Sequence, residues 1–381
     1  MIALAVARAL SRAGVPVVAL GHETDPIRWS RHRDSFIDVG GGRPSQSRFL
    51  DWLTENDGGG VVLPCNDDAL EVLAEHQEEL ADRYTVPETD PEIVRALLDK
   101  ERTYELARAA GVHTPRTITV RSGEDLDEVE RTLEFPCALK PLHSHRFAEH
   151  FGARKKVLVA ENRAALDSAF AALERVGVTA LATEIVPGPD EFVSYYGYLD
   201  EGGKPLFDFT KRKLRQSPPR FGLGAYHVTD WNPEVAEAGR RFLQGIGFRG
   251  LAVVEFKRDV RDGRLVVIES NPRFSAATEL LQAAGVNVAL LVYNRLLGRP
   301  LPSCSPYTEG LHFWIPAADV RAFLGYRSAG ELSLWGWARS LMVPQRLPVA
   351  SFEDPGPILG RAGLKLRRAP RRVADLVKAN G

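Results

Sequence analysis

The spacing of apolar residues predicts that helices and strands alternate at the start of this chain. A helical period over residues 3–13 is followed by short apolar runs, which predict strands. A second helical period follows over residues 67–82. This alternation is typical of a Rossmann-like α/β domain, which we expect over residues 1–90. The strands are predicted at residues 15–20, 34–39 and 60–64.

The strand and glycine-rich turn that usually open such a domain are missing, because the chain begins inside the predicted first helix. We interpret residue 1 as a start inside a longer gene product. No G-x-G-x-x-G pattern lies nearby, which argues against a Rossmann oxidoreductase.

Residues 91–300 show a different pattern, in which helices accompany antiparallel strand pairs. Asp90 and Pro91 predict a helix start, since Asp caps helices and Pro fits their first position. Residues 301–381 are less regular and form a C-terminal extension in this interpretation. Two helices are expected within 91–110, the first running through Lys100 and the second to Ala110. Further helices are expected at 121–133, 162–176, 233–246 and 276–297, and strands at 114–120, 137–141, 157–160, 180–186, 192–199, 205–210, 251–256 and 267–273.

Composition narrows the class of protein. Of the 381 residues, 44% are apolar and 26% charged, and the net charge of −1 argues against a nucleic-acid binder. The three cysteines, Cys65, Cys137 and Cys304, have no paired spacing, which favours a reducing compartment. No apolar run reaches the roughly 18 residues that span a bilayer. We therefore expect a cytoplasmic protein without a transmembrane segment.

Candidate chemistry gathers where an apolar run delivers Glu269, Asn271 and Arg273 at alternate positions. Alternation on a strand places these three side chains on one face. The preceding apolar run carries Glu255, and a turn at 261–264 predicts that the two strands pair antiparallel. Two carboxylates and an amide oxygen suit Mg²⁺, and an arginine beside that ion suits a polyphosphate. The alternative is a surface ion pair on a solvent-facing strand.

The order of parts over residues 90–297 resembles the ATP-grasp superfamily of carboxylate–amine ligases. The resemblance implies α/β and α+β architecture: a Rossmann-like N-terminal domain, then an ATP-grasp fold of two α+β subdomains. It also implies an enzyme that phosphorylates a carboxylate and lets an amine displace the phosphate. The implied cofactors are ATP and Mg²⁺, with Mn²⁺ as an alternative ion. The matching signals are Asp99-Lys100, Lys140-Pro141, residues 183–188 with Glu191, Glu255, and Glu269-x-Asn271-x-Arg273.

The resemblance also implies a role for each matching residue. Lys100 and Lys140 would bind polyphosphate oxygens, as point charges suited to that task. Arg273 would neutralise the transferring phosphoryl group. For the lysines and Glu191, the alternative is an ordinary solvated side chain. The remaining roles are adenine contacts from the backbone of Glu184, Ile185 and Val186, ribose contacts from Glu191, and Mg²⁺ ligation by Glu255, Glu269 and Asn271.

Two segments depart from the family pattern. The phosphate-covering loop at 142–156 holds one glycine instead of several, and Arg146, Arg154 or the neighbouring lysines would replace backbone donors. His143 and His145 resemble zinc ligands, but no third ligand at motif spacing accompanies them. The basic C-terminal segment 361–372 is interpreted as a solvated tail, with a membrane-surface contact as the alternative.

The second departure is the basic stretch at 211–224. We expect Lys211, Lys213 and Arg215 to alternate toward one face, where Lys213 and Arg215 would contact the γ-phosphate or a substrate carboxylate. Its Pro and Gly residues predict a mobile loop that closes over bound nucleotide and carboxylate. The alternative is a solvated basic loop.

These observations predict an ATP-dependent ligase acting on a small-molecule carboxylate and amine, without a nucleic-acid partner and compatible with a homodimer. The alternative from another class is a nucleotide-binding ATP-grasp module without ligase activity. The sequence does not identify the two substrates.

Overall fold

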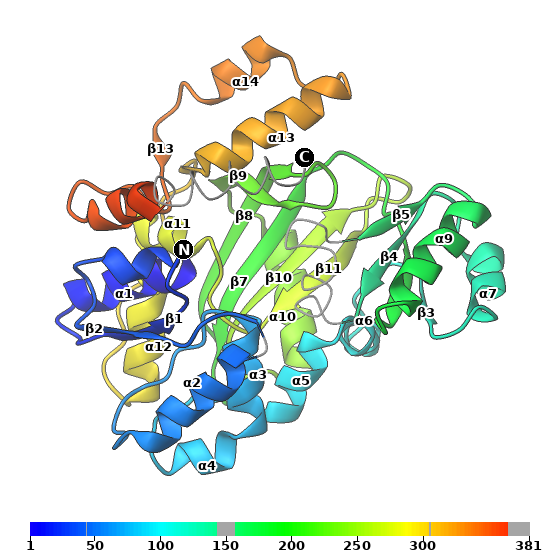
Figure 1. The fold of residues 1–381 in the computed structure, drawn as a ribbon. Coiled ribbons are helices and arrows are strands. Elements are labelled where there is room, and N and C mark those ends of the chain that lie inside the picture. The colour runs from blue at the N-terminus through cyan, green and yellow to red at the C-terminus, as the bar shows by residue number, and fades with distance from the viewer. Residues whose placement is uncertain (43, 143–156, 305, 365–381) are drawn as a thin grey trace, which may run out of the picture.

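The computed structural model describes residues 1–381 except 43, 143–156, 305 and 365–381, and three sheets organise it (Figure 1). A two-stranded sheet lies in the N-terminal region, a four-stranded sheet follows it in the chain, and a seven-stranded sheet carries the rest. In the described part of the chain, no helix is long and apolar enough to cross a bilayer.

The N-terminal region joins a parallel pair of strands to several helices. The strands are β1 (Val18–Gly21) and β2 (Ser35–Asp38). The strand predicted at 60–64 is wrong, because this segment forms only an isolated bridge between Val61 and Thr85. The helix α2 was not predicted because its sequence is mostly polar, and only Leu53 is fully buried. The helices are α1 (Ile2–Arg12), η1 (Pro26–Trp29), α2 (Pro44–Glu55), α3 (Asp67–Glu75) and α4 (Gln77–Ala81).

Two capped helices connect this region to the sheets that follow. The Asp90 carboxylate accepts the Glu92 N–H at 2.7 Å and starts α5 (Pro91–Leu98), as the sequence predicts. The Asp99 carboxylate caps α6 (Lys100–Ala109) in the same way. The second cap separates the two helices, so Lys100 occupies the first position of α6.

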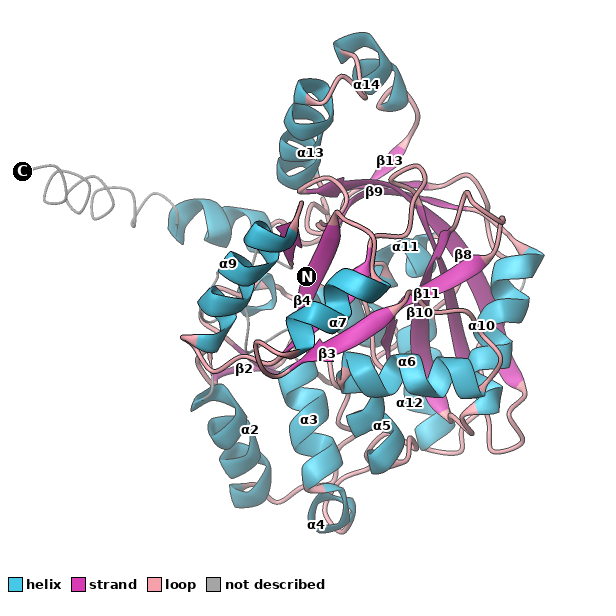
Figure 2. Cartoon of the chain, turned by 90° about the vertical axis from the view of Figure 1, so that its right-hand side faces the viewer, coloured by secondary structure: helices cyan, strands magenta, loops and turns pink. Residues whose placement is uncertain are grey.

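The four-stranded sheet is antiparallel, in the order β3-β6-β4-β5. Its apolar face packs against α7 (Asp125–Thr132) and α9 (Arg163–Glu174), and Figures 1 and 2 show both helices on one side of it. Lys140 lies near the end of β4 and Glu184 ends β6. The strands are β3 (Thr117–Val120), β4 (Cys137–Pro141), β5 (Leu158–Ala160) and β6 (Ala180–Glu184).

The seven-stranded sheet has the order β11-β10-β7-β8-β9-β12-β13. Apolar residues on one face, including Tyr195 and Val254, pack against α10 (Pro233–Gly245) and α6. Residues on the other face, including Tyr196, pack against α1, α11 (Thr278–Ala283) and α12 (Val288–Leu296). The strands are β7 (Phe192–Leu199), β8 (Pro205–Ser217), β9 (Leu223–Thr229), β10 (Gly250–Arg258), β11 (Leu265–Asn271), β12 (His312–Trp314) and β13 (Gln345–Arg346).

The prediction of a mobile loop at 211–224 is wrong. The strand β8 continues through Ser217 and β9 begins at Leu223, so five residues connect them. Strand β8 is paired on both sides, by β7 and by β9, so this stretch is held in the sheet rather than free to move as a loop. Lys211 and Lys213 are 3% and 5% exposed.

The C-terminal extension is integrated into the fold. Its strands β12 and β13 extend the large sheet, and α13 (Pro316–Ser328) packs on β8 and β9 below α14 (Leu334–Ser340) (Figure 1). Farther along, the buried Asp354 carboxylate accepts a hydrogen bond from Arg8 of α1 at 3.0 Å. The extension therefore contacts both the large sheet and the start of the chain.

Candidate nucleotide and metal site

One row of residues across the large sheet carries most of the predicted chemistry. Glu269 of β11 lies opposite Glu255 of β10, Glu255 lies opposite Ser194 of β7, and Ser194 lies opposite Lys211 of β8. Directly opposed residues share a face of a sheet, and neighbouring strands lie about 4.8 Å apart. The two acids therefore stand side by side, and the lysine lies two strands farther on.

A β-bulge in β11 produces this pairing. Val267 lies opposite Phe256 and Glu269 opposite Glu255, so Ile268 is the extra residue. The bulge lets Val267 remain in the core on one face while Glu269 reaches the other face, where its side chain is exposed. The Tyr104 hydroxyl donates to the Ile268 carbonyl oxygen at 3.0 Å and stabilises the bulge.

The candidate metal ligands lie on two paired antiparallel strands, as predicted: Glu255 on β10, and Glu269 and Asn271 on β11. The Glu255 Oε1 atom is 2.8 Å from Lys213 Nζ, so a cation already neutralises this carboxylate. Among the described residues, no group of three or more His, Cys, Asp or Glu could hold a metal. The candidate set instead combines two carboxylates with an amide oxygen, and this all-oxygen donor set fits Mg²⁺.

Arg273 does not share the strand with Asn271, which corrects the prediction of alternation over 269–273. The strand ends at Asn271, and the Arg273 N–H turns back to donate to the Asn271 carbonyl at 2.9 Å. Its guanidinium donates to Asp67 Oδ1 at 2.6 Å and to Asn271 Oδ1 at 3.2 Å. The turn still brings Arg273 beside the candidate metal ligand, and it joins this end of the sheet to α3.

Lys100 and Lys140 approach the acids from outside the large sheet. Lys100, Tyr104, Glu269 and Asn271 line one cleft. Burial, followed by the charge of Lys100, lowers the pKa of Lys140 to about 8, while Glu269 and Glu255 oppose this shift. The two lysines and the two acids are therefore within electrostatic reach, where the small and large sheets meet.

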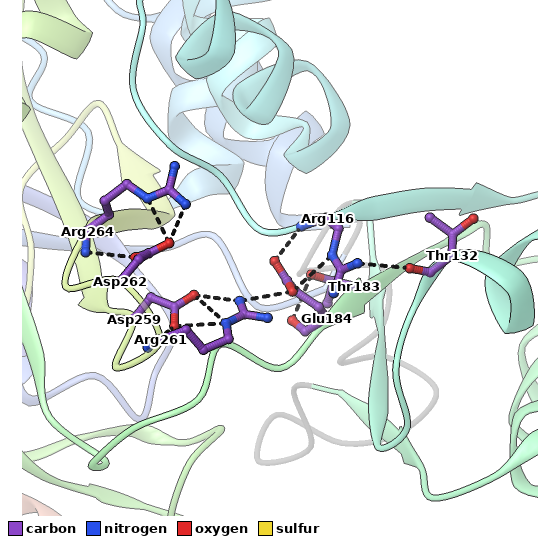
Figure 3. Close-up of polar contacts among 8 residues, drawn as sticks. All are labelled: Arg116, Thr132, Thr183, Glu184, Asp259, Arg261, Asp262 and Arg264. Atoms are coloured by element: carbon purple, nitrogen blue, oxygen red, sulfur yellow. Dashed lines mark hydrogen bonds and ion pairs between the residues drawn. The ribbon is translucent and has the colours of Figure 1, made fainter.

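Glu184 joins the two sheets, as Figure 3 shows. Its carboxylate accepts the Arg116 N–H at 2.9 Å, Arg116 Nε at 3.2 Å and an Arg261 guanidinium nitrogen at 3.2 Å. Arg261 belongs to the β10–β11 turn and also pairs with Asp259. Sequence reasoning missed both arginines, because each lies in a connecting segment without a motif.

The hinge prediction needs one correction at Glu184. Its N–H donates to the Arg116 carbonyl oxygen at 3.0 Å, so this group is not available to adenine. The Glu184 carbonyl accepts a hydrogen bond from Thr183 Oγ1 at 3.3 Å, and adenine contacts from it and from the backbone of Ile185 and Val186 stay a prediction. Glu191 precedes β7, where its carboxylate is 54% exposed and 3.9 Å from Arg212; its ribose contact stays a prediction.

Arg215 is not on the same face as Lys211 and Lys213, which contradicts the predicted alternation. Lys213 lies opposite His227 and Arg215 opposite Tyr226, so a bulge at Leu214 reverses the side-chain direction. The Arg215 guanidinium donates to both carboxylate oxygens of Asp319, at 2.6 and 3.0 Å. Asp319 belongs to α13 and is fully buried, so Arg215 binds the C-terminal extension rather than a phosphate.

Sequence reasoning also missed His227, a buried residue of β9. Burial, followed by the charges of Lys211 and Lys213, lowers the pKa of His227 well below its usual range. The imidazole is therefore neutral at pH 7. The distance between its Nδ1 atom and Lys211 Nζ is 3.2 Å, and Lys211 Nζ also donates to Ser194 Oγ at 3.3 Å. Burial lowers the pKa of Lys211 to about 8.

Some predicted contacts lie outside the described residues. They include the glycine-poor loop with His143, His145, Arg146 and Arg154, and the basic tail from residue 365 onward.

Comparison with known proteins finds ligases among the relatives of this chain. No protein-family model matches the chain. D-aspartate ligase of Enterococcus faecium is 26% identical over 284 residues, which are 71% of this chain and 67% of that protein. D-alanine–D-alanine ligase of Chromohalobacter salexigens is 28% identical over 180 residues, which are 46% of this chain and 54% of that protein.

The fold also matches solved structures. The biotin carboxylase domain of Hydrogenobacter thermophilus 2-oxoglutarate carboxylase, solved with MgADP, ADP and bicarbonate, superposes with a TM-score of 0.62. The identity is 18%, and the match covers 82% of this chain and 71% of that one. At this identity the match concerns the fold. The two sequence relatives are both ligases, and with this fold they support the resemblance to the ATP-grasp carboxylate–amine ligases that the sequence indicates.

Proposed function

We propose that this chain uses Mg·ATP to activate the carboxylate of an amino acid and joins it to an amine. The observation that carries the proposal is the row of Glu269, Glu255, Ser194 and Lys211. This row has two carboxylates and a buried ammonium group on one face of one sheet, which supports a site for Mg²⁺ and phosphate. D-aspartate ligase and D-alanine–D-alanine ligase, which align with the chain, support amino acids as the substrate class.

In the first step, a substrate carboxylate oxygen forms a bond to the γ-phosphorus of ATP, and the bond to the β,γ-bridging oxygen breaks to release ADP. Lys100 and Lys140 bind the phosphate oxygens and hold the chain of phosphates in line with the carboxylate. Arg273 neutralises charge on the phosphoryl group in transit. Glu255, Glu269 and Asn271 would hold Mg²⁺, which would supply charge neutralisation for the phosphates.

In the second step, the neutral amine attacks the acyl carbon, and the C–O bond to phosphate breaks. The amine proton leaves with solvent or phosphate, and the products are an amide and inorganic phosphate. Lys213 and Lys211 lie in the sheet beyond Glu255, where they provide positive charge for the acyl phosphate and the departing phosphate.

The nucleotide is proposed to lie between the two sheets. The Glu184 carbonyl, Ile185 and Val186 would contact adenine, and Glu191 would accept hydrogen bonds from the ribose hydroxyls.

In this proposal residues 1–90 form the N-terminal domain, 91–300 the ATP-grasp domain and 301–381 the extension. Mn²⁺ is the alternative ion to Mg²⁺, and a homodimer is an assembly compatible with the proposal.

The test is ADP release from Mg·ATP in the presence of pairs of amino acids, with mass spectrometry of the products. We expect ADP release that depends on an amino acid and a product whose mass equals the two substrates minus water. The alternative, a nucleotide-binding module, predicts Mg·ATP binding without ADP release for every pair. Sedimentation velocity measures the assembly, and a monomer would contradict the homodimer.

A further inference from the structure

A continuous hydrogen-bonded chain connects the C-terminal extension to the candidate metal ligand Glu255. Gln216 donates from Nε2 to Asp190 Oδ1 at 2.5 Å, and its Oε1 accepts from Lys213 Nζ at 3.3 Å. Lys213 Nζ donates in turn to Glu255 Oε1 at 2.8 Å. Gln216 and Lys213 are 1% and 5% exposed, so solvent contributes little to this chain of contacts.

Three separate elements converge on Asp190, the residue before Glu191. Besides Gln216 of β8, the Tyr326 hydroxyl of α13 donates to Asp190 Oδ2, and so does the Arg220 N–H at 2.6 Å. Arg220 has φ of 70°, in the left-handed region that residues other than glycine seldom adopt. The β8–β9 turn is therefore bent so that one backbone N–H points at this carboxylate.

The Asp190 carboxylate fixes the orientation of the Gln216 amide. A carboxylate accepts but cannot donate, so the amide must turn its NH₂ group toward Asp190. Its carbonyl oxygen then faces Lys213, an ammonium group that can only donate. If the amide were reversed, oxygen would meet carboxylate and NH₂ would meet ammonium, and two buried contacts would become repulsive.

We propose that Gln216 and Asp190 are positioning residues of the ligase, which hold Lys213 beside Glu255 and couple it to the nucleotide loop at Glu191. Lys213 has acceptors on both sides, so it keeps its place when Glu255 turns toward Mg²⁺. Without Gln216, its remaining acceptor on this chain of contacts is Glu255, and the ammonium would compete with the metal for that carboxylate. This inference rests on the proposed function.

The decisive test exchanges the amide and the carboxylate. In Gln216→Glu, two carboxylates face each other, and no donor links position 216 to Asp190. In the double variant Asp190→Asn with Gln216→Glu, the new amide at position 190 donates to the new carboxylate at position 216, which still accepts from Lys213. The amide oxygen at position 190 still accepts from Tyr326 and Arg220, and the net charge equals that of the parent. The exposed Gln244→Glu on α10 is the control for an added charge.

We expect Gln216→Glu to lower kcat by about 10- to 100-fold. This is the usual effect of losing a hydrogen-bonding group that helps to orient a metal ligand. The double variant should recover to within about threefold of the parent, in line with the restored contacts. Gln244→Glu should leave kcat unchanged. Full activity of Gln216→Glu, or a double variant no better than this single one, would overturn the proposal.

A second measurement, of binding, does not require catalysis. It therefore tests the positioning role of Gln216 separately from the proposed ligase activity. Calorimetry measures the Mg²⁺ dependence of binding of a nonhydrolysable ATP analogue. Gln216→Ala should weaken the apparent Mg²⁺ affinity by about tenfold or more, because Lys213 then competes for Glu255. If the parent releases no ADP with any amino-acid pair, the proposed function fails, while this affinity still tests the network. An affinity equal to the parent's in Gln216→Ala would overturn the positioning role.

Discussion

Lys213 Nζ lies 2.8 Å from Glu255 Oε1, and both groups belong to central strands of the large sheet. This pair joins the cation proposed to bind phosphate directly to a carboxylate proposed to bind Mg²⁺. In the proposed function, Lys213 is held in place before substrate arrives, which lowers the cost of organising the site during reaction. The predictions below test the groups arranged around this pair.

Glu269→Gln removes one anionic ligand from the candidate Mg²⁺ site and keeps the size of the side chain. We expect ADP release to fall to background, because the neutral amide binds a hard cation weakly. Circular dichroism and the unfolding midpoint should stay at parental values, since this side chain is exposed. Parental ADP release by the variant would remove Glu269 from the site.

Glu191→Ala tests the ribose contact. ATP binding measured by calorimetry should weaken by about 1–3 kcal/mol, the cost of leaving polar partners unpaired. The matched control is Glu128→Ala, another exposed acid, on α7. If both variants bind ATP as the parent does, Glu191 does not contact the nucleotide.

The lowered pKa of Lys140, about 8, predicts a pH dependence. Above pH 8 the empty site loses this positive charge, so the KM for ATP should rise between pH 8 and 10. The free energy of unfolding should increase with pH over the same range. The reason is that Lys140 has its ordinary pKa near 10.5 in the unfolded chain, so the unfolded state binds more protons than the folded state between pH 8 and 10.5. The contribution of Lys140 to the free energy of unfolding therefore increases from pH 8 toward 10.5.

Lys140→Arg is the control for this pH dependence, because arginine keeps its charge over the whole range. Its KM for ATP should change less between pH 8 and 10 than that of the parent. The same rise in the variant and the parent would assign the pH dependence to another group.

Asp319→Asn tests whether Arg215 acts through the C-terminal extension. Removing one partner of a buried ion pair costs about 3–5 kcal/mol, because the remaining charge stays buried. Urea unfolding should show a loss of this order, while the KM for the carboxylate substrate of the folded enzyme stays within about twofold of the parent's. The exposed pair of Arg241 and Glu237 is the control, and Arg241→Gln should cost less than about 1 kcal/mol.

If Asp319→Asn raised the KM for the carboxylate strongly and left the unfolding free energy unchanged, Arg215 would belong to the substrate site after all. Measuring both quantities on one variant therefore separates the structural role from the catalytic one.

Local chemistry was readable from the sequence wherever a residue's role depends on near neighbours. The caps at Asp90 and Asp99 satisfy N–H groups within three residues, so they could be predicted without the fold. The antiparallel pairing of the strands carrying Glu255 and Glu269 followed in the same way from a short turn between two apolar runs. The order of these parts along the chain was enough to indicate the family.

Contacts across the sheets were decided by tertiary structure. Strict alternation predicted Lys213 and Arg215 on one face, but a bulge at Leu214 separates them, and only the pairing of β8 with β9 reveals it. The basic stretch resembled a loop because its charges suggested solvent, whereas the fold supplies Glu255 and Asp319 as partners. These partners lie 42 and 104 residues away in the chain. Sequence spacing therefore determined most of the candidate residues, and strand register and long-range packing determined which of them meet.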